Sequence, residues 1–151
     1  MKYVRVEPLS ERHGYYLDPQ AYIDVLPEIS SGLPAGAAEF ATDPGHYDFR
    51  SLHCVKDLTF SKMTLADGEG VLTLEVLLAP SEWKHESGLR LHYSDVHLLG
   101  VSTKGADGLL DRLGSLQLDE ALPHPSGFSH EIAFTSGSIA IVAADLAATW
   151  G

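Results

Sequence analysis

The chain has 151 residues, the length of one ordinary domain, and its 44% hydrophobic and 21% charged residues are typical of a folded globular protein and argue against disorder. Ten Lys and Arg against 21 Asp and Glu give a net charge of −11, which argues against direct binding to nucleic acid or to an anionic membrane and is equally consistent with plain solubility and with a basic protein partner. One cysteine excludes an intramolecular disulfide; the first 19 residues lack signal-peptide features, and no apolar run approaches the ~18 residues of a membrane span, so elimination predicts a cytoplasmic protein.

We expect residues 1–46 to form a loop-rich N-terminal part that contains one short helix. Asp18 followed by Pro19 has the pattern of an N-cap with proline at the first helical position, and Pro27 closes the predicted helix. Residues 30–45 are rich in Gly, Ala, Ser and Pro, so we expect an extended connection there, with a short strand at residues 38–41.

Beyond Tyr47 the hydrophobic period changes to two, as in strands. Leu72, Leu74, Val76 and Leu78 define one such strand, and the Asp-Gly pair in the preceding ADGEG predicts a hairpin turn. The partner strand is then residues 55–65. Its apolar residues change parity at Ser61-Lys62, which predicts a bulge.

Three further strands are predicted in the second half of the chain from the same alternation. A parity change at Ser94-Asp95 again predicts a bulge, and Ser136-Gly137 predicts a turn. The segments are residues 89–98, 128–134 and 138–143, with a final short strand at residues 145–150 and one weak helical turn within residues 107–118.

These elements predict a single domain over residues 1–151, mainly β, with residues 47–151 as an antiparallel β core. We expect antiparallel sheets packed as a sandwich-like domain, with one short N-terminal helix. The chain lacks the strand-helix alternation of a parallel sheet.

Cys54 and His53 are neighbours in SLHCVKDL and suggest a reactive pair. If this stretch is the opening of a strand, the two side chains point to opposite faces, so His53 is badly placed to activate the thiol. We therefore predict a buried structural cysteine.

Eight histidines raise the question of a metal site, but close ligand pairs are missing. His92 and His97 are the nearest pair, and only a bulge could bring them to one side together with Asp95. The sequence contains only partial matches to the motifs HExxH and GxSxG. We therefore assign no catalytic, cofactor-binding or metal-binding residue.

His130 shares the parity of Phe128, Ile132 and Phe134, which places it toward the core as a neutral, hydrogen-bonded histidine or a ligand position. His53 is a plausible counterpart at the start of the first hairpin strand.

Aromatic residues in loop-like segments are candidate interface anchors. The same residues could equally staple loops to their own domain. They are Tyr15, Tyr16, Tyr47 and Trp83.

The layout of residues 47–151 resembles bacterial domains of unknown function and polymorphic-toxin immunity proteins. The resemblance lies in the entry Leu52-His53-Cys54-Val55, the following hairpin, the strand LHYSDV and the terminal hairpin FSHEIAFTSGSIAIVAADL. It departs from the pattern at Cys54, where an aspartate is common. The resemblance implies a binding or uncharacterised protein and carries over no catalytic residue.

The sequence therefore favours a non-enzymatic bacterial protein-interaction module, in its sharpest form an immunity-type protein that neutralises a basic toxin domain through its acidic surface. The alternative is a small enzyme or ligand-binding protein with a pocket lined by histidines and carboxylates. The oligomeric state is left open.

Overall fold

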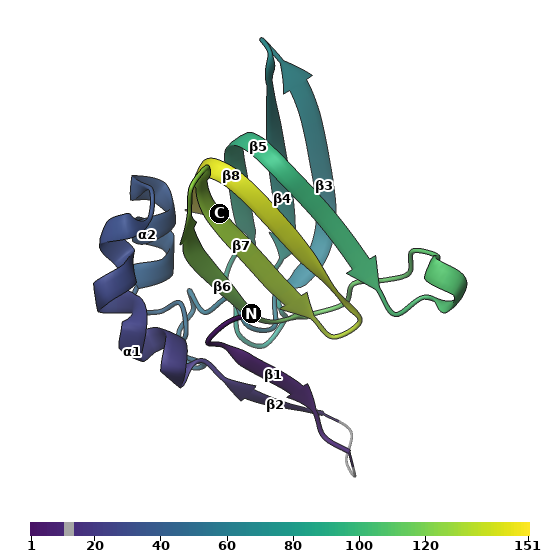
Figure 1. The fold of residues 1–151 in the computed structure, drawn as a ribbon. Helices are drawn as coiled ribbons and strands as arrows, with labels where there is room; N and C mark the ends of the chain where they lie inside the picture. Colours follow the sequence, from purple (N-terminus) through teal and green to yellow (C-terminus); the bar gives the residue numbers. More distant parts are fainter. Residues whose placement is uncertain (11–13) are drawn as a thin grey trace.

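The computed structural model describes residues 1–10 and 14–151, and its main element is a six-stranded antiparallel sheet (Figure 1). The strand order is β3-β4-β5-β8-β7-β6, so the predicted mainly β, antiparallel architecture is confirmed. The strands are β3 (Thr59–Gly68), β4 (Val71–Ala79), β5 (Leu89–Thr103), β6 (Leu116–His124), β7 (Gly127–Phe134) and β8 (Gly137–Trp150).

The sheet is so strongly curved that its two outer strands meet at one end. The backbone N–H of Asp57 donates to the carbonyl of Leu116 at 2.9 Å, and the N–H of Leu116 donates to the carbonyl of Leu58 at 2.7 Å. A third bond joins the N–H of Phe60 to the carbonyl of Gly114 at 3.1 Å. The expected sandwich-like packing is not confirmed, because the six strands form one curved sheet around the core.

The N-terminal part is more regular than the sequence indicated. A separate hairpin of β1 (Arg5–Pro8) and β2 (Tyr15–Asp18) precedes α1 (Gln20–Ile29), the 3-10 turn η1 (Ser30–Gly32) and α2 (Ala35–Thr42). Within the described residues, two α-helices are therefore present where one was expected. The predicted strand at residues 38–41 is wrong, since those residues lie inside α2.

Both helices obtain their N-terminal hydrogen bonds from carboxylates. Asp18 accepts the N–H of Gln20 at 2.9 Å, but the N-cap position is occupied by Pro19 and not by Asp18 as predicted. Pro27 lies inside α1, so the prediction that it ends the helix is wrong. Asp145 on β8 accepts the N–H groups of Gly36 and Ala37 at 3.1 and 2.9 Å. Asp145 is more than 100 residues away from α2 in the sequence. Its hydrogen bonds therefore cap the N-terminus of α2 and also hold the helix against the sheet.

The first long hairpin follows the predicted pattern with two shifts. The register changes between Phe60 and Lys62, which confirms the predicted bulge. The turn lies at Glu69 and Gly70, both with positive φ (55° and 81°), and not at Asp67-Gly68. The strand begins at Thr59, later than predicted, because residues 51–58 form turns.

The later strands are longer than predicted. β5 continues through its irregularity near Asp95, which has a positive φ of 51°, and the register shifts between Val96 and Leu98. The two last predicted strands are one, β8, which pairs with β5 along its length. β6 has no counterpart in the sequence prediction.

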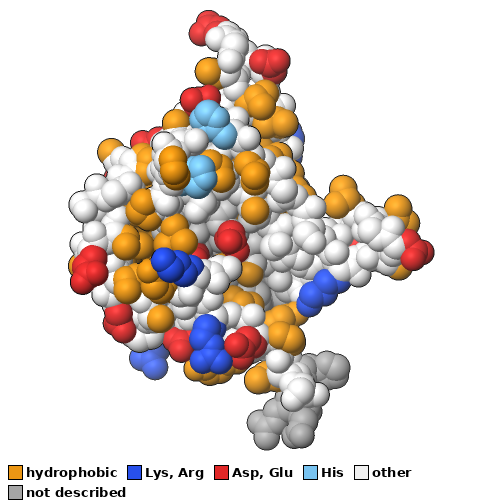
Figure 2. Space-filling model, viewed as in Figure 1, with side chains coloured by type: hydrophobic (Ala, Val, Ile, Leu, Met, Phe, Trp, Pro, Cys, Tyr) orange, Lys and Arg blue, Asp and Glu red, His pale blue; other side chains and the backbone are white. Residues whose placement is uncertain are grey.

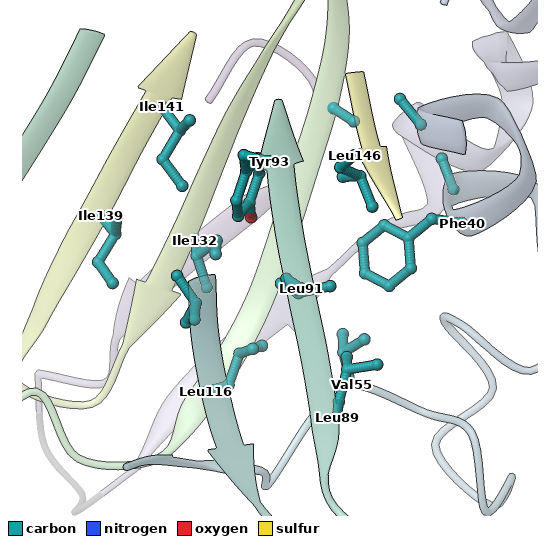
Figure 3. Close-up of a cluster of buried hydrophobic side chains, with 14 of the residues drawn as sticks. Phe40, Val55, Leu89, Leu91, Tyr93, Leu116, Ile132, Ile139, Ile141 and Leu146 are labelled. Carbon is teal, nitrogen blue, oxygen red and sulfur yellow. The ribbon is translucent and has the colours of Figure 1, made fainter. Parts of the chain in front are cut away.

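The core lies inside the curve of the sheet. Figure 3 shows Leu91, Tyr93, Ile132 and Leu146 projecting into it from the strands, with Phe40 reaching the same cluster from α2. The helices thus cover a part of the core that the sheet leaves open.

Two segments project from the rounded body, and both carry exposed hydrophobic side chains (Figure 2). The distal part of the β3–β4 hairpin exposes Leu65 and Leu72, and the loop between β5 and β6, which contains the 3-10 turn η2 (Ala106–Gly108), exposes Leu109 and Leu110.

Candidate functional site

A buried hydrogen-bonded network joins the helical layer, which consists of α1, η1 and α2, to the sheet. Asp119 on β6 receives His46 Nε2 on Oδ1 and His130 Nε2 on Oδ2, both at 2.7 Å. The other ring nitrogen of His46 lies 3.0 Å from the carbonyl oxygen of Phe40, and that of His130 lies 2.7 Å from the hydroxyl of Tyr93. Asp119, His46 and His130 are at most 2% exposed.

The partners in this network determine where its protons lie. The carbonyl of Phe40 can only accept, so His46 Nδ1 carries a proton, and an ionised Asp119 requires a second proton on Nε2. His46 is then a buried cation paired with the carboxylate. His130 Nε2 donates to Asp119 Oδ2, and its Nδ1 shares a hydrogen bond with the Tyr93 hydroxyl.

The two histidines hold the Asp119 carboxyl in its ionised form. Burial works to raise the pKa of this carboxyl, but the charge of His46, the hydrogen bonds from His130 and His46, and the charge of His130 outweigh it, so the pKa lies well below its ordinary value. Burial, followed by the charge of Asp119, raises the pKa of Tyr93 well above its ordinary value, which keeps its hydroxyl a donor.

The network is complete in itself. Within residues 1–10 and 14–151, no buried side-chain nitrogen or oxygen lacks a hydrogen-bond partner. All the polar side-chain atoms of His46, Asp119 and His130 are thus hydrogen-bonded within the protein. Its chemical role is to fix the elements that it joins.

The neighbouring carboxylate holds the N-terminal segment. Glu120 is 2% exposed and accepts three backbone N–H groups, from Lys2, Tyr3 and Val4, at 2.6 to 2.7 Å. Sequence reasoning missed both Asp119 and Glu120. The available signal was an acidic pair inside the apolar run LQLDEAL, because buried charges are rare unless they are paired.

The surface above this network contains an apolar hollow of about 470 Å³ between α1 and the segment that follows α2. Tyr47, whose hydroxyl donates to the backbone oxygen of Asp119 at 2.9 Å, forms part of its wall. The lining residues are Ile23, Leu26, Pro27, Ala41, Thr42, Asp43, Pro44, Tyr47 and Asp48.

A second hollow of about 280 Å³ lies on the other side of α2, against the end of β8. It contains two carboxylates, Glu39 and Asp43, beside His53 and the indole of Trp150. The remaining lining residues are Gly36, Phe40, Leu146, Ala147 and Ala148. Asp43 borders both hollows, so they are adjacent.

Charge is segregated along the chain in the same region. Residues 13–49 contain no Lys or Arg and six acids. The segment therefore carries −6 of the total −11, leaving −11 − (−6) = −5 for the other 151 − 37 = 114 residues. The acids are Asp18, Asp24, Glu28, Glu39, Asp43 and Asp48.

The four predicted interface aromatics do not converge. Trp83 is 86% exposed and Tyr16 is 44% exposed. The Tyr15 hydroxyl donates to the carbonyl of Thr135 at 2.6 Å, and Tyr47 donates to Asp119, so these two staple loops to their own domain. Of the four, only Tyr47 lines a hollow beside α2.

The two histidines singled out from the sequence differ in position. His130 lies in the core, at 0% exposure. His53 is not buried: its side chain is 55% exposed, because residues 51–58 form turns and not a strand. Its ring stacks on Trp150 with centroids 5.0 Å apart.

Cys54 is buried, unlike its neighbour His53. Burial raises the pKa of the Cys54 thiol, so the thiolate is disfavoured. Its backbone oxygen accepts His85 Nε2 at 2.7 Å, which ties the turn to the segment between β4 and β5. His53 and Cys54 are thus separated, as expected, although by a turn.

In the described part of the chain, no three His, Cys, Asp or Glu side chains are arranged to hold a metal ion, and no helix is long and apolar enough to cross a membrane. Comparison of the chain with protein-family models, with curated proteins and with solved structures found no match.

Proposed function

We infer that the protein is a non-enzymatic protein-interaction module whose helical layer binds a basic partner. The observation that carries this proposal is the coincidence of two adjacent hollows with a segment that has six acids and no Lys or Arg. Apolar hollows provide buried contact area. Surrounding charges of one sign accelerate the association of an oppositely charged partner and disfavour other partners.

The buried network supports this role by making the surface rigid. His46 is hydrogen-bonded to α2 through Phe40 and to β6 through Asp119, and Tyr47 is hydrogen-bonded to β6 beside it. A surface that is already ordered loses less conformational entropy on binding. A basic toxin domain, the partner favoured by the resemblance in sequence, is one partner of this chemistry.

The alternative of a ligand-binding protein with a histidine- and carboxylate-lined pocket is favoured by one observation, the presence of His53 with Glu39 and Asp43 in the second hollow. Its volume of about 280 Å³ lies below the 300–1,000 Å³ typical of pockets that enclose a small molecule. A single side chain of a larger partner fits this space better.

The proposal is tested by capturing partners of the immobilised chain from a lysate of its source organism, purifying them and measuring their affinity by calorimetry at 50 and 200 mM salt. We expect a basic protein whose affinity falls at least tenfold between the two conditions, since exposed charge pairs are screened by salt. A partner with neutral or acidic pI, or an affinity that does not change with salt, would contradict the proposal.

A further inference from the structure

We propose that the hollow between α2 and the end of β8 binds an arginine side chain of the basic partner, while the apolar hollow beside it takes a neighbouring aliphatic side chain. This inference rests on the proposed function and specifies its contact. The observations that support it are the two hollows, the residues that line them and their shared border at Asp43.

The electrostatics of the second hollow favour a cation. Glu39 is exposed and has no ion-pair partner among the described residues, and the nearest basic group to Asp43 is His53, at 3.9 Å from Oδ2. Asp43 Oδ1 accepts the N–H of Gly45 at 2.7 Å, which fixes the carboxylate but leaves Oδ2 available. Both carboxylates lie in the last turn of α2 or directly after it, where the helix dipole also attracts positive charge.

The wall of the hollow suits the flat, weakly hydrated guanidinium of arginine better than a compact ammonium. Trp150, Ala147 and Ala148 supply apolar surface against which the methylene stem can pack. Trp150 is held in place because His53 and His85 stack on it, with centroids 5.0 and 6.0 Å away and interplanar angles of 12° and 19°. His85 is itself fixed by hydrogen bonds to Cys54 and Ser81.

The first hollow supplies the second half of the contact. Its surface is largely apolar, from Ile23, Leu26 and Ala41, and it has acids only at its border, Asp43 and Asp48. A segment that places arginine next to an aliphatic residue can therefore fill both hollows, with Asp43 between the two side chains. The arrangement combines a charged contact for specificity with an apolar contact for affinity.

The test is an NMR titration of the ¹⁵N-labelled full chain with Nα-acetyl-arginine methylamide, using the citrulline analogue as the uncharged control. We expect arginine to shift the indole N–H of Trp150 and the amides of Glu39 and Asp43 with a millimolar dissociation constant, and citrulline to shift them at least fivefold less. Equal shifts from both compounds, or arginine shifts confined to other regions, overturn the inference.

Two double variants distinguish binding in this hollow from a general effect of the negative net charge. Glu39→Gln with Asp43→Asn removes two charges and retains the Asp43 hydrogen bond to Gly45, so it should abolish the arginine-dependent shifts. Asp67→Asn with Glu69→Gln removes two charges at the tip of the β3–β4 hairpin and should leave them unchanged. Arginine shifts that persist in the first variant would falsify the inference.

The two proposals fail in different ways. If arginine does not bind at the second hollow but a captured basic protein still binds with strong salt dependence, the arginine pocket is wrong and the interaction module stands. If arginine shifts Trp150 but every captured partner is neutral or acidic, the pocket stands and the proposed function is wrong.

Discussion

Asp119 is the residue on which the buried polar contacts converge. Its two carboxylate oxygens receive two histidines, and its backbone oxygen receives Tyr47, so one residue joins β6, β7 and the segment after α2. A buried ion pair adds little net stability by itself, but removal of one partner leaves the other charge buried and uncompensated. Substitution here should therefore cost much more than loss of one ordinary hydrogen bond.

Asp119→Asn should lower the free energy of unfolding by about 3 kcal/mol or more, because the buried His46 cation loses its counter-charge. The matched control is Asp48→Asn, the same chemical change at an exposed position, which should alter stability by no more than about 0.5 kcal/mol. Urea unfolding followed by circular dichroism measures both. Equal stabilities for the two variants would show that Asp119 is not part of a charged pair.

The pH dependence follows from the direction of the Asp119 pKa. Because the folded-state pKa lies below the unfolded value of about 3.9, the carboxylate contributes stability that is fully present above roughly pH 5 and is lost as the pH falls through the folded-state pKa. The free energy of unfolding of the wild-type chain should therefore fall steeply below about pH 4, whereas that of Asp119→Asn should fall less steeply over the same range. Urea unfolding between pH 7 and 2 checks this prediction. The same dependence of stability on pH in both proteins would contradict it.

Residue-level sequence reasoning worked where a local pattern carried the information. His130 shares its parity with Phe128 and Ile132, and all three are buried. His53 was misplaced because its position depends on turns at residues 51–58, which alternation does not reveal. His130 is hydrogen-bonded to Asp119 and Tyr93. Both of these residues come from other strands, so a single sequence could not identify them as its partners.

Among the elements, α2 shows how a short helix is maintained by contacts distant in sequence. Its eight residues are too few for a stable isolated helix, and its first N–H groups are capped by Asp145 of β8. Gly36 is required at the contact, because a Cβ there would overlap the carbonyl oxygen of Leu146. The close approach of α2 to β8 also forms one side of the second hollow.

Gly36→Ala should lower the melting temperature by about 3 °C, since the steric overlap of roughly 2 kcal/mol exceeds the gain of up to about 1 kcal/mol that alanine normally gives in a helix. Gly100→Ala on β5 is the control, because open space surrounds that position, and it should leave the melting temperature unchanged or slightly higher. Thermal unfolding by calorimetry distinguishes them. An unchanged melting temperature for Gly36→Ala would mean that α2 does not dock closely on β8.

The elements predicted correctly from the sequence are those with one buried and one open face, such as β4 and β7, where alternation is clear. β6 was missed because its residues 116–121 are buried on both faces and include two acids, so the period-two signal is absent. α2 was missed because its Ala- and Gly-rich sequence has little periodicity and its cap is supplied by β8.

At the scale of the whole molecule, charge is divided between two regions. The segment of residues 13–49 carries −6 with no basic residue, whereas the longer remainder carries −5. Net charge was visible in the sequence, but its meaning required the fold, which places the acidic segment in the helical layer and brings β8 against α2 to form the second hollow. The proposed basic partner would then contact a segment that contains acidic but no basic residues.

The most direct test of this account is the affinity of the purified partner for two charge-matched double variants, measured by calorimetry at 50 mM salt. Glu39→Gln with Asp43→Asn should weaken binding by about 30-fold, or roughly 2 kcal/mol, whereas Asp67→Asn with Glu69→Gln should weaken it less than threefold. Equal losses for both variants, or none for the first, would contradict recognition of a basic partner by the helical layer.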